Sequence, residues 1–267
     1  MTKKPLVSII IGAHNCAESL SISIKSILEQ KYTNWELIIC DDCSTDNTYE
    51  VACKYANLYK RITVIRNSEN MKLAYTLNQC LSVVSGKYVA RMDADDVCLP
   101  DRLTKQVQIL EKHPEYAVVG GGIIPYNEHS EKKPRIPKEI PQVKDLIKDV
   151  PFYHPTIMMR KSVYDDLGGY TVEKRTTKGQ DMDLWFRFFA KGYKGYNIQS
   201  PVLKYHESLE DYKAKRNYDA AWGMVQTRYI GFKLNHIPLY FYPFIFKPVI
   251  SVTIPRKIMY KLHNRKI

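Results

Sequence analysis

Three carboxylates lie within four consecutive residues of this chain. Asp93, Asp95 and Asp96 follow a short apolar run typical of a buried strand, and a helix is expected from Asp101 onward. Acids at positions i and i+2 beyond a strand end can project together into the cleft above the carboxyl edge of a sheet. Carboxylate oxygens there suit a hard divalent cation that keeps open positions for phosphate oxygens. One acid suffices to cap a helix, and Asp101 is expected to do so, so the other three indicate a metal–phosphate site rather than a capping loop.

The elements that must position these acids alternate between strands and helices. Continuous apolar runs predict buried strands, and leucine and isoleucine at helical spacing predict helices between them. This rhythm, with a period of roughly 30 residues, predicts an α/β fold with a mainly parallel sheet flanked by helices. The strands are predicted at 6–11, 35–40, 62–65, 87–91, 116–120, 154–159 and 202–206, the later helices at 101–112, after residue 183 and at 218–232, and an irregular flap at 125–151.

Several other classes of site are not supported by the sequence. The first strand is followed neither by G-x-G-x-x-G nor by a P-loop, so an NAD site and a P-loop nucleotide site are not expected. The six cysteines show no disulfide framework and no paired zinc spacing, which favours reduced thiols. The N-terminus has no apolar signal segment, so secretion is not expected and a cytoplasmic location is predicted.

The positive charge of the chain is concentrated at its C-terminal end. The formal net charge is +12, and the segment from Lys213 to Ile267 carries eleven Lys and Arg against one acid. A nucleic-acid partner is not expected, because the rest of the chain is nearly neutral. Residues 237–267 mix these basic residues with Tyr, Phe and Pro, and no run is long enough to span a bilayer. This tail is predicted to lie on an anionic membrane surface, peripheral to the inner face of the cell membrane, rather than to serve only solubility.

Four separate stretches, taken together and in order, resemble the family-2 inverting glycosyltransferases over roughly residues 5 to 210. They are Val7–Asn15, Cys40–Thr48, Asp93–Asp96 with Pro100–Arg102, and Gln180–Arg187. The resemblance implies a GT-A-like fold with a nucleotide-sugar-binding half at 1–112 and an acceptor-binding half at 113–210. Residues 211–267 would then form a basic, aromatic, helical and membrane-associating extension.

The resemblance also implies roles for individual residues. Asp181 is the implied catalytic base, and Asp95 and His206 are implied ligands of Mn²⁺ or Mg²⁺. The nucleotide sugar is expected to meet Ala13, His14, Asn15, Asp42, Lys72, Asp93 and Ala94, with Asp42 on the uracil imide and Asp93 near the ribose. The acceptor is expected to meet His154, Gln180, Trp185 and Arg187. Asp42 could instead be a turn acid, and His14 and His206 could be structural histidines.

Two positions depart from the family pattern. Many members read Asn-x-Gly after the third strand, where this chain has Asn70-Met71-Lys72, so the backbone approach to the nucleotide could differ. Lys72 could instead donate to a phosphate. Members usually carry Glu-Asp at the acceptor helix, where this chain has Gln180-Asp181. A glutamine can still orient a hydroxyl, and losing one charge lowers the pKa of the neighbouring base slightly.

The implied reaction is a single displacement. The base takes the proton of an acceptor hydroxyl, which attacks the anomeric carbon from the face opposite the leaving nucleoside diphosphate, so an α-linked donor yields a β-linked product. The expected donor is a UDP-sugar, and the expected acceptor is a lipid-diphosphate-linked sugar of O-antigen or capsule assembly. Two alternatives remain. A sugar-nucleotide nucleotidyltransferase would need a Gly-rich basic loop after the first strand, and an inactive membrane-recruiting subunit is favoured only by Gln180.

Overall fold

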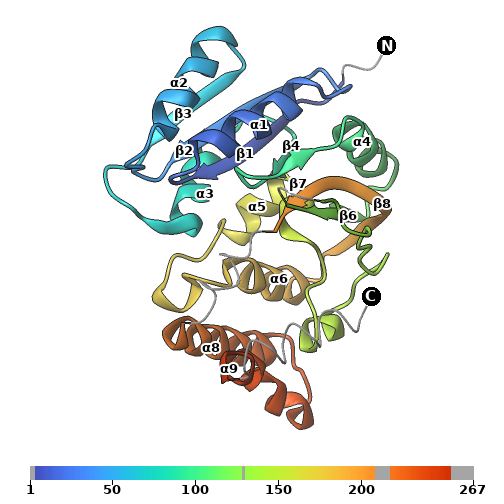
Figure 1. Ribbon diagram of the computed structural model, residues 1–267. Coiled ribbons are helices and arrows are strands. Elements are labelled where there is room, and N and C mark those ends of the chain that lie inside the picture. Colours follow the sequence, from blue (N-terminus) through green and yellow to red (C-terminus); the bar gives the residue numbers. More distant parts are fainter. Residues whose placement is uncertain (1–3, 128–129, 208–216, 254–267) are drawn as a thin grey trace.

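The computed structural model describes residues 4–127, 130–207 and 217–253. One eight-stranded sheet runs through the molecule in the order β3-β2-β1-β4-β7-β6-β8-β5, with helices on both faces (Figure 1). The predicted mixed, mainly parallel α/β sheet is confirmed. The strands are β1 (Val7–Ala13), β2 (Trp35–Asp41), β3 (Ile62–Arg66), β4 (Tyr88–Arg91), β5 (Val97–Cys98), β6 (Tyr116–Tyr126), β7 (Met158–Arg160) and β8 (Lys194–His206).

The N-terminal strands are parallel because helices connect them. β1 pairs in parallel with β2 and β4, and β2 with β3, so the loops that follow these strands meet at one sheet edge. Alternate strand residues face two separate cores, as in Ile10 against Ile9 and Ile11. One core holds α1 (Ala17–Leu28), α2 (Thr48–Leu58) and α4 (Arg102–Lys112), and the other holds α3 (Lys72–Val83), α5 (Lys161–Leu167) and α6 (Gln180–Ala190).

Most predicted elements end within one or two residues of the observed ones, and the larger differences have physical reasons. The strand expected at 154–159 begins only at Met158, and residues 154–156 form a 3₁₀ turn, η2, because Pro155 has no N–H for a central ladder. β6 and β8 are longer than predicted, since Gly and Pro within them weaken the strand pattern. Helix α6 starts at Gln180, so Asp181 lies in its first turn. Asp101 stands at the start of α4 without a side-chain capping bond, and it pairs instead with Lys31 at 2.9 Å.

Within the predicted flap, residues 143–147 form a short 3₁₀ helix, η1, and the C-terminal segment packs beside α6. It comprises α8 (Tyr218–Leu234), η4 (Leu239–Phe246) and α9 (Lys247–Thr253), at the end of the molecule away from α1 and α2 (Figure 1). The Phe186 and Phe232 rings lie 5.9 Å apart, and a Cβ on Gly231 would meet the Phe186 ring at 2.2 Å. The predicted boundary at residue 210 therefore separates segments that share one core. None of the described helices is long and apolar enough to cross a membrane, and residues 254–267 of the predicted tail lie outside the described part.

Candidate active site

The turns after β1 and β2 are tied together at the sheet edge. His14 contacts the Asp42 carbonyl oxygen through Nδ1 at 2.9 Å, and its Nε2 lies 3.0 Å from the Asn70 amide nitrogen. Asn15, with a φ of +48°, accepts the Thr45 backbone N–H at 2.8 Å. Ala13 is buried, whereas His14 and Asn15 are exposed. The structure thus brings four predicted nucleotide-binding residues, Ala13, His14, Asn15 and Asp42, to one place.

Asp42 is held mainly by the protein itself. Its Oδ1 accepts hydrogen bonds from the Asn67 side chain at 2.7 Å and the Met71 N–H at 2.8 Å, and its Oδ2 accepts the Lys72 N–H at 2.9 Å. Because a carboxylate oxygen has two lone pairs, Oδ2 keeps one for a ligand. The Asp42 carboxylate therefore fixes the loop before α3, and it can still accept one hydrogen bond from a nucleobase.

Lys72 occupies the position where many family members carry glycine, and its backbone keeps the conformation that glycine favours. Its φ is +70°, in the left-handed region, and its side chain is exposed. At this departure from the family pattern the chain thus combines a left-handed backbone with an exposed ammonium group.

The three acids of the loop after β4 meet as the sequence predicts. Ligand oxygens of Asp93, Asp95 and Asp96 all lie within 4.8 Å of one another. Asp93 is neutralised by Arg91, which binds it through both terminal guanidinium nitrogens, one of them at 2.9 Å. Arg91 itself is only 4% exposed.

Asp96 is the buried member of this cluster. Its Oδ1 accepts the His206 backbone N–H at 3.0 Å, and its buried Oδ2 has no hydrogen-bond partner within the described ranges. Burial, and then the charges of Asp93 and Asp95, raise the pKa of the Asp96 carboxyl well above its ordinary value. An orphaned buried oxygen among three acids fits a divalent cation. The predicted ligands Asp95 and His206 are neighbours, with His206 Nδ1 3.6 Å from Asp95 Oδ2.

Two buried arginines of this site were not predicted from the sequence. Arg102, 1% exposed, donates to the carbonyl oxygens of Arg91 at 2.7 Å and Ile157 at 3.3 Å, and so ties the end of β4 to the segment before β7. This contact gives the Pro-Asp-Arg stretch after the acids a structural reason. Arg91 could have been found from the sequence, because it ends an apolar strand run and stands two residues before Asp93.

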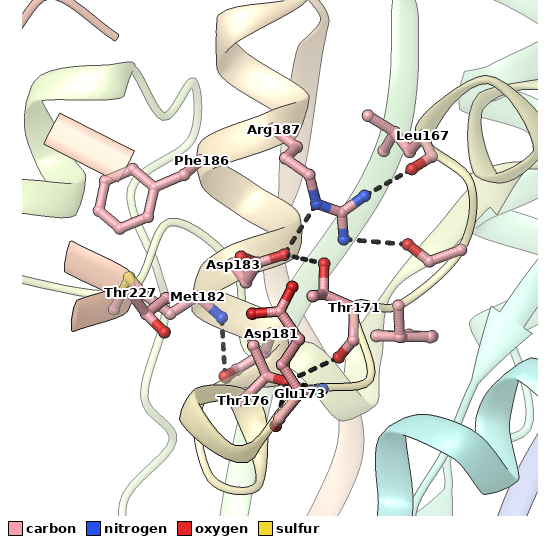
Figure 2. Close-up of polar contacts among 12 residues, drawn as sticks. Leu167, Thr171, Glu173, Thr176, Asp181, Met182, Asp183, Phe186, Arg187 and Thr227 are labelled. Atoms are coloured by element: carbon pink, nitrogen blue, oxygen red, sulfur yellow. Dashed lines mark hydrogen bonds and ion pairs between the residues drawn. The ribbon is translucent and has the colours of Figure 1, made fainter. Parts of the chain in front are cut away.

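Asp181 lies partly buried in the first turn of α6. Its Oδ1 accepts the Met182 N–H at 2.8 Å (Figure 2). Burial raises the pKa of Asp181, against the lowering effect of that hydrogen bond and of the Arg91 charge, while the Asp93 charge raises it further. Asp181 therefore lies within electrostatic range of the Arg91–Asp93 pair. Beside it, the Gln180 Oε1 accepts the Gly179 N–H at 3.1 Å.

Asp183, two residues on, is a structural acid. It accepts hydrogen bonds from Thr171 at 2.6 Å, Arg175 at 2.6 Å and Arg187 at 2.8 Å; Figure 2 shows those from Thr171 and Arg187. Burial opposes ionisation of this carboxyl, but the three donors outweigh burial and lower its pKa. A carboxylate neutralised by two arginines is a poor proton acceptor, so Asp181 remains the candidate base.

Three of the four predicted acceptor residues are committed inside the protein. Trp185 is fully buried, which contradicts a direct acceptor contact, because its indole packs 4.6 Å from the Phe152 ring. His154 is 6% exposed and bonds Tyr170 through Nε2 at 2.9 Å. Burial, and then the Arg91 charge, lower the pKa of its imidazole well below the ordinary value, so it stays neutral. Arg187 donates to protein oxygens, and Gln180 lies partly exposed at the start of α6.

Comparisons with known proteins agree with this geometry. The family model for glycosyl transferase family 2 matches residues 8–168. Over its whole length the chain is 42% identical to the putative glycosyltransferase EpsE of Bacillus subtilis, covering 96% of that protein. It is 26% identical to the Escherichia coli UDP-Glc:alpha-D-GlcNAc-diphosphoundecaprenol beta-1,3-glucosyltransferase WfaP, covering 89% of this chain and 92% of WfaP.

Two solved structures share the fold. The mannosyltransferase PcManGT of Pyrobaculum calidifontis, in complex with GDP-Man and Mn²⁺, matches with a TM-score of 0.65 and 19% identity, over 99% of this chain and 80% of that one. TarS 1–349 of S. aureus, in complex with UDP-GlcNAc, matches with a TM-score of 0.66 and 17% identity, over 83% of this chain and 65% of that one. At these identities the likeness shows a common architecture only.

Proposed function

The chain belongs to glycosyl transferase family 2 and has the GT-A fold, and we propose that it is an inverting, metal-dependent enzyme of bacterial surface-polysaccharide assembly. It moves one sugar from a UDP-sugar onto a hydroxyl of a lipid-diphosphate-linked glycan and forms a β-linkage. One observation carries this proposal: ligand oxygens of Asp93, Asp95 and Asp96 lie within 4.8 Å of one another directly after β4, which pairs in parallel with β1 at the edge where the turns after β1 and β2 meet. The charges of Arg91 and Asp93 also act on Asp181, the candidate base.

The donor is held by the turns at the sheet edge. Asp42 and the exposed turn of His14 and Asn15 receive the nucleoside, and the Lys72 ammonium group lies on the same loop as the Asp42 contacts. Asp95, Asp96 and His206 would hold Mn²⁺ or Mg²⁺, which when bound neutralises charge on the leaving diphosphate. Arg91 keeps Asp93 in place and balances its charge.

Asp181 supplies the proton chemistry. It accepts the proton of the acceptor hydroxyl while that oxygen attacks the anomeric carbon from the face opposite the diphosphate. A pKa raised by burial brings the carboxylate closer to the proton affinity that a general base needs at neutral pH. A single attack inverts the anomeric centre. No second nucleophile is required for this step.

The relatives support the choice of donor and acceptor. WfaP is named for transfer from UDP-Glc to a GlcNAc-diphosphoundecaprenol, and TarS was solved with UDP-GlcNAc. PcManGT was solved with GDP-Man, so the identity of the nucleobase in the donor needs a direct test. The remaining Asp42 lone pair suits an imide N–H of uracil.

A lipid-linked acceptor requires the enzyme to work at a membrane surface. Many large apolar side chains on α8, η4 and α9 are exposed, and we name them the C-terminal apolar surface. Exposed apolar side chains in such number on one segment suit a binding face. Lys148 lies 5.8 Å from the Phe244 ring and Lys233 5.6 Å from the Tyr229 ring, which suits anionic lipid at the inner face of the cell membrane. The surface comprises Tyr218, Trp222, Tyr229, Ile230, Leu234, Leu239, Tyr240, Phe244, Phe246 and Ile250.

The test is a donor screen with the full chain, Mn²⁺ and a lipid-diphosphate-linked sugar. We expect release of UDP, and a product whose anomeric coupling in NMR is that of a β-linkage. No UDP release here, together with formation of a UDP-sugar and pyrophosphate from UTP and a sugar 1-phosphate in a parallel assay, would identify a nucleotidyltransferase. Nucleotide binding without turnover of any UDP-, GDP- or dTDP-sugar would identify an inactive recruiting subunit.

A further inference from the structure

The guanidinium group of Arg187 binds residues 167–169, which precede α6, the helix that carries Asp181. Its Nε donates to Asp183 at 2.8 Å, its Nη1 to the Leu167 carbonyl oxygen at 2.6 Å and its Nη2 to the Gly169 carbonyl oxygen at 3.0 Å, as Figure 2 shows for Asp183 and Leu167. Three nitrogen donors of one planar group thus bind α6 and residues 167–169. A lysine could keep the charge beside Asp183 but could not reach both carbonyl oxygens.

Asn78 on α3 binds the same segment at the next residue, Tyr170. The Asn78 side-chain amide donates to the Tyr170 carbonyl oxygen at 2.8 Å, and its Oδ1 accepts the Tyr170 N–H at 2.8 Å. Gly169 makes this approach possible. It has a φ of +68°, and a Cβ there would lie 2.6 Å from Asn78 Oδ1. The segment 167–171 is therefore held between α3, which carries Asn78, and α6, which carries Arg187 and Asp181.

The segment 167–171 includes Tyr170, which lies within electrostatic range of Asp181. Tyr170 is 2% exposed, and its hydroxyl bonds His154 at 2.9 Å and Tyr164 at 3.1 Å. Burial, then the neighbouring Tyr164 and, further down, the Asp181 charge raise the pKa of this phenol well above its ordinary value, which places Tyr170 in the field of Asp181. The next residue, Thr171, donates to Asp183 at 2.6 Å, directly beside the first turn of α6.

We propose that Asn78 and Arg187 are positioning residues that clamp the segment 167–171 and so set Asp181 at a defined place relative to the donor. Helix α3 starts at Lys72, whose N–H holds Asp42, so one rigid element joins the nucleotide turn to the clamp. Arg187, predicted from the sequence to bind the acceptor directly, acts through this segment instead. The inference rests on the proposed function for its kinetic consequence only.

The test uses Asn78→Ala, Arg187→Lys and the double variant. Each single change should lower kcat by roughly tenfold or more, since small misplacements of reacting groups have large effects on rate. The dissociation constant for UDP, measured by calorimetry, should stay within about twofold, because Asp42 and the acid cluster are untouched. The double variant should lose less than the product of the two single effects, because both residues hold one segment.

Ser82→Ala, one turn further along α3, is the matched control and should leave kcat unchanged. Hydrogen exchange gives a readout that needs no enzyme activity: the Tyr170 amide, which donates to Asn78, should exchange faster in Asn78→Ala and keep the wild-type rate in Ser82→Ala. Unchanged exchange, multiplicative kinetic effects, or a loss of UDP affinity equal to the loss of kcat would overturn the clamp. Absence of transfer by the wild type, with the exchange result intact, would instead refute the proposed function.

Discussion

The backbone N–H of Lys72 donates to Asp42 Oδ2 at 2.9 Å, while Lys72 itself holds a φ of +70°. A residue with a Cβ costs roughly 1–2 kcal/mol in this conformation, and the hydrogen bonds to a buried carboxylate keep it there. The strain lies at the start of α3, in the loop that we propose to face the donor. A lysine at this place is explained if its side chain contributes to donor binding.

Lys72→Gly should therefore separate stability from donor affinity. We expect the free energy of unfolding, measured in urea, to rise by about 1 kcal/mol, because relief of left-handed strain exceeds the entropy that glycine adds to the unfolded chain. Affinity for UDP should fall several-fold with the loss of the ammonium group. Lys72→Ala is the control and should lose affinity without the gain in stability. Unchanged UDP affinity in both variants would leave Lys72 without a role at the phosphate.

Asp95→Asn should nearly abolish transfer and leave the thermal midpoint close to that of the wild type. The Asp95 carboxylate belongs to the acid cluster and is partly exposed, so we expect it to serve a cation rather than the core. Mn²⁺ binding, followed by calorimetry, should weaken in parallel. Asp101→Asn removes an exposed acid six residues away that pairs with Lys31, and should change neither quantity. Full activity of the wild type in excess chelator would contradict the metal assignment.

Asp181→Asn should lower turnover by roughly 10²–10⁴-fold, the usual contribution of a positioned general base, and leave UDP affinity unchanged. The change should not cost stability. Since burial raises the folded-state pKa of Asp181, the folded protein binds more protons than the unfolded chain between the two pKa values, and wild-type stability falls as pH rises through that window. The variant lacks this loss, so at pH 7 it should be at least as stable as the wild type. Wild-type turnover should fall as acid protonates Asp181, beginning above pH 3.8.

Asp183→Asn should behave in the opposite way. The folded-state pKa of Asp183 is lowered, so its stabilising contribution is fully present above the ordinary value of 3.8 and is lost as pH falls through the lower folded value. Removing this charge leaves Arg187 without its ion pair to Asp183 and Arg175 with Glu173 alone. It should cost about 3 kcal/mol at pH 7 by urea unfolding. The wild-type advantage over the variant should shrink below pH 3.8. An equally stable variant at pH 7 would show that the Arg175 and Arg187 pairs contribute little.

Leu239→Asn combined with Tyr240→Asn should weaken binding to anionic vesicles by at least tenfold, since each large apolar side chain contributes about 1.5–3 kcal/mol when it leaves water. These residues are 78% and 73% exposed, so the fold should be unaffected. Leu58→Asn, at a 66% exposed position on α2, is the control. Truncation after Leu234 is a poorer test, because Ile237 and Ile245 are part of the core. Equal vesicle binding by the double variant and the control, at low and at high salt, would exclude this surface.

The sequence determined the donor side of this protein to a large extent. The acids at 93–96 and the turns after the first two strands each follow a continuous apolar run, and parallel strands joined by helices carry such turns to one sheet edge. Pattern and spacing therefore predicted the cluster of Asp93, Asp95 and Asp96, whereas the family resemblance implied that His14 and Asp42 serve one ligand. Local signals sufficed because each side chain lies within a few residues of the strand end that aims it.

The tertiary structure alone decided the acceptor side. Asp181 and Asp183 stand in the same helical turn on different faces, and sequence periodicity could not say which of them meets Thr171 and Arg175. Trp185 and Arg187 matched a binding motif, yet packing buried the one and turned the other onto main-chain oxygens. Asn78 meets Tyr170 across 92 residues, and Arg102 meets Ile157 across 55. Such pairings depend on how separate elements pack, and a hydrogen bond between side chain and distant main chain leaves no periodic trace in the sequence.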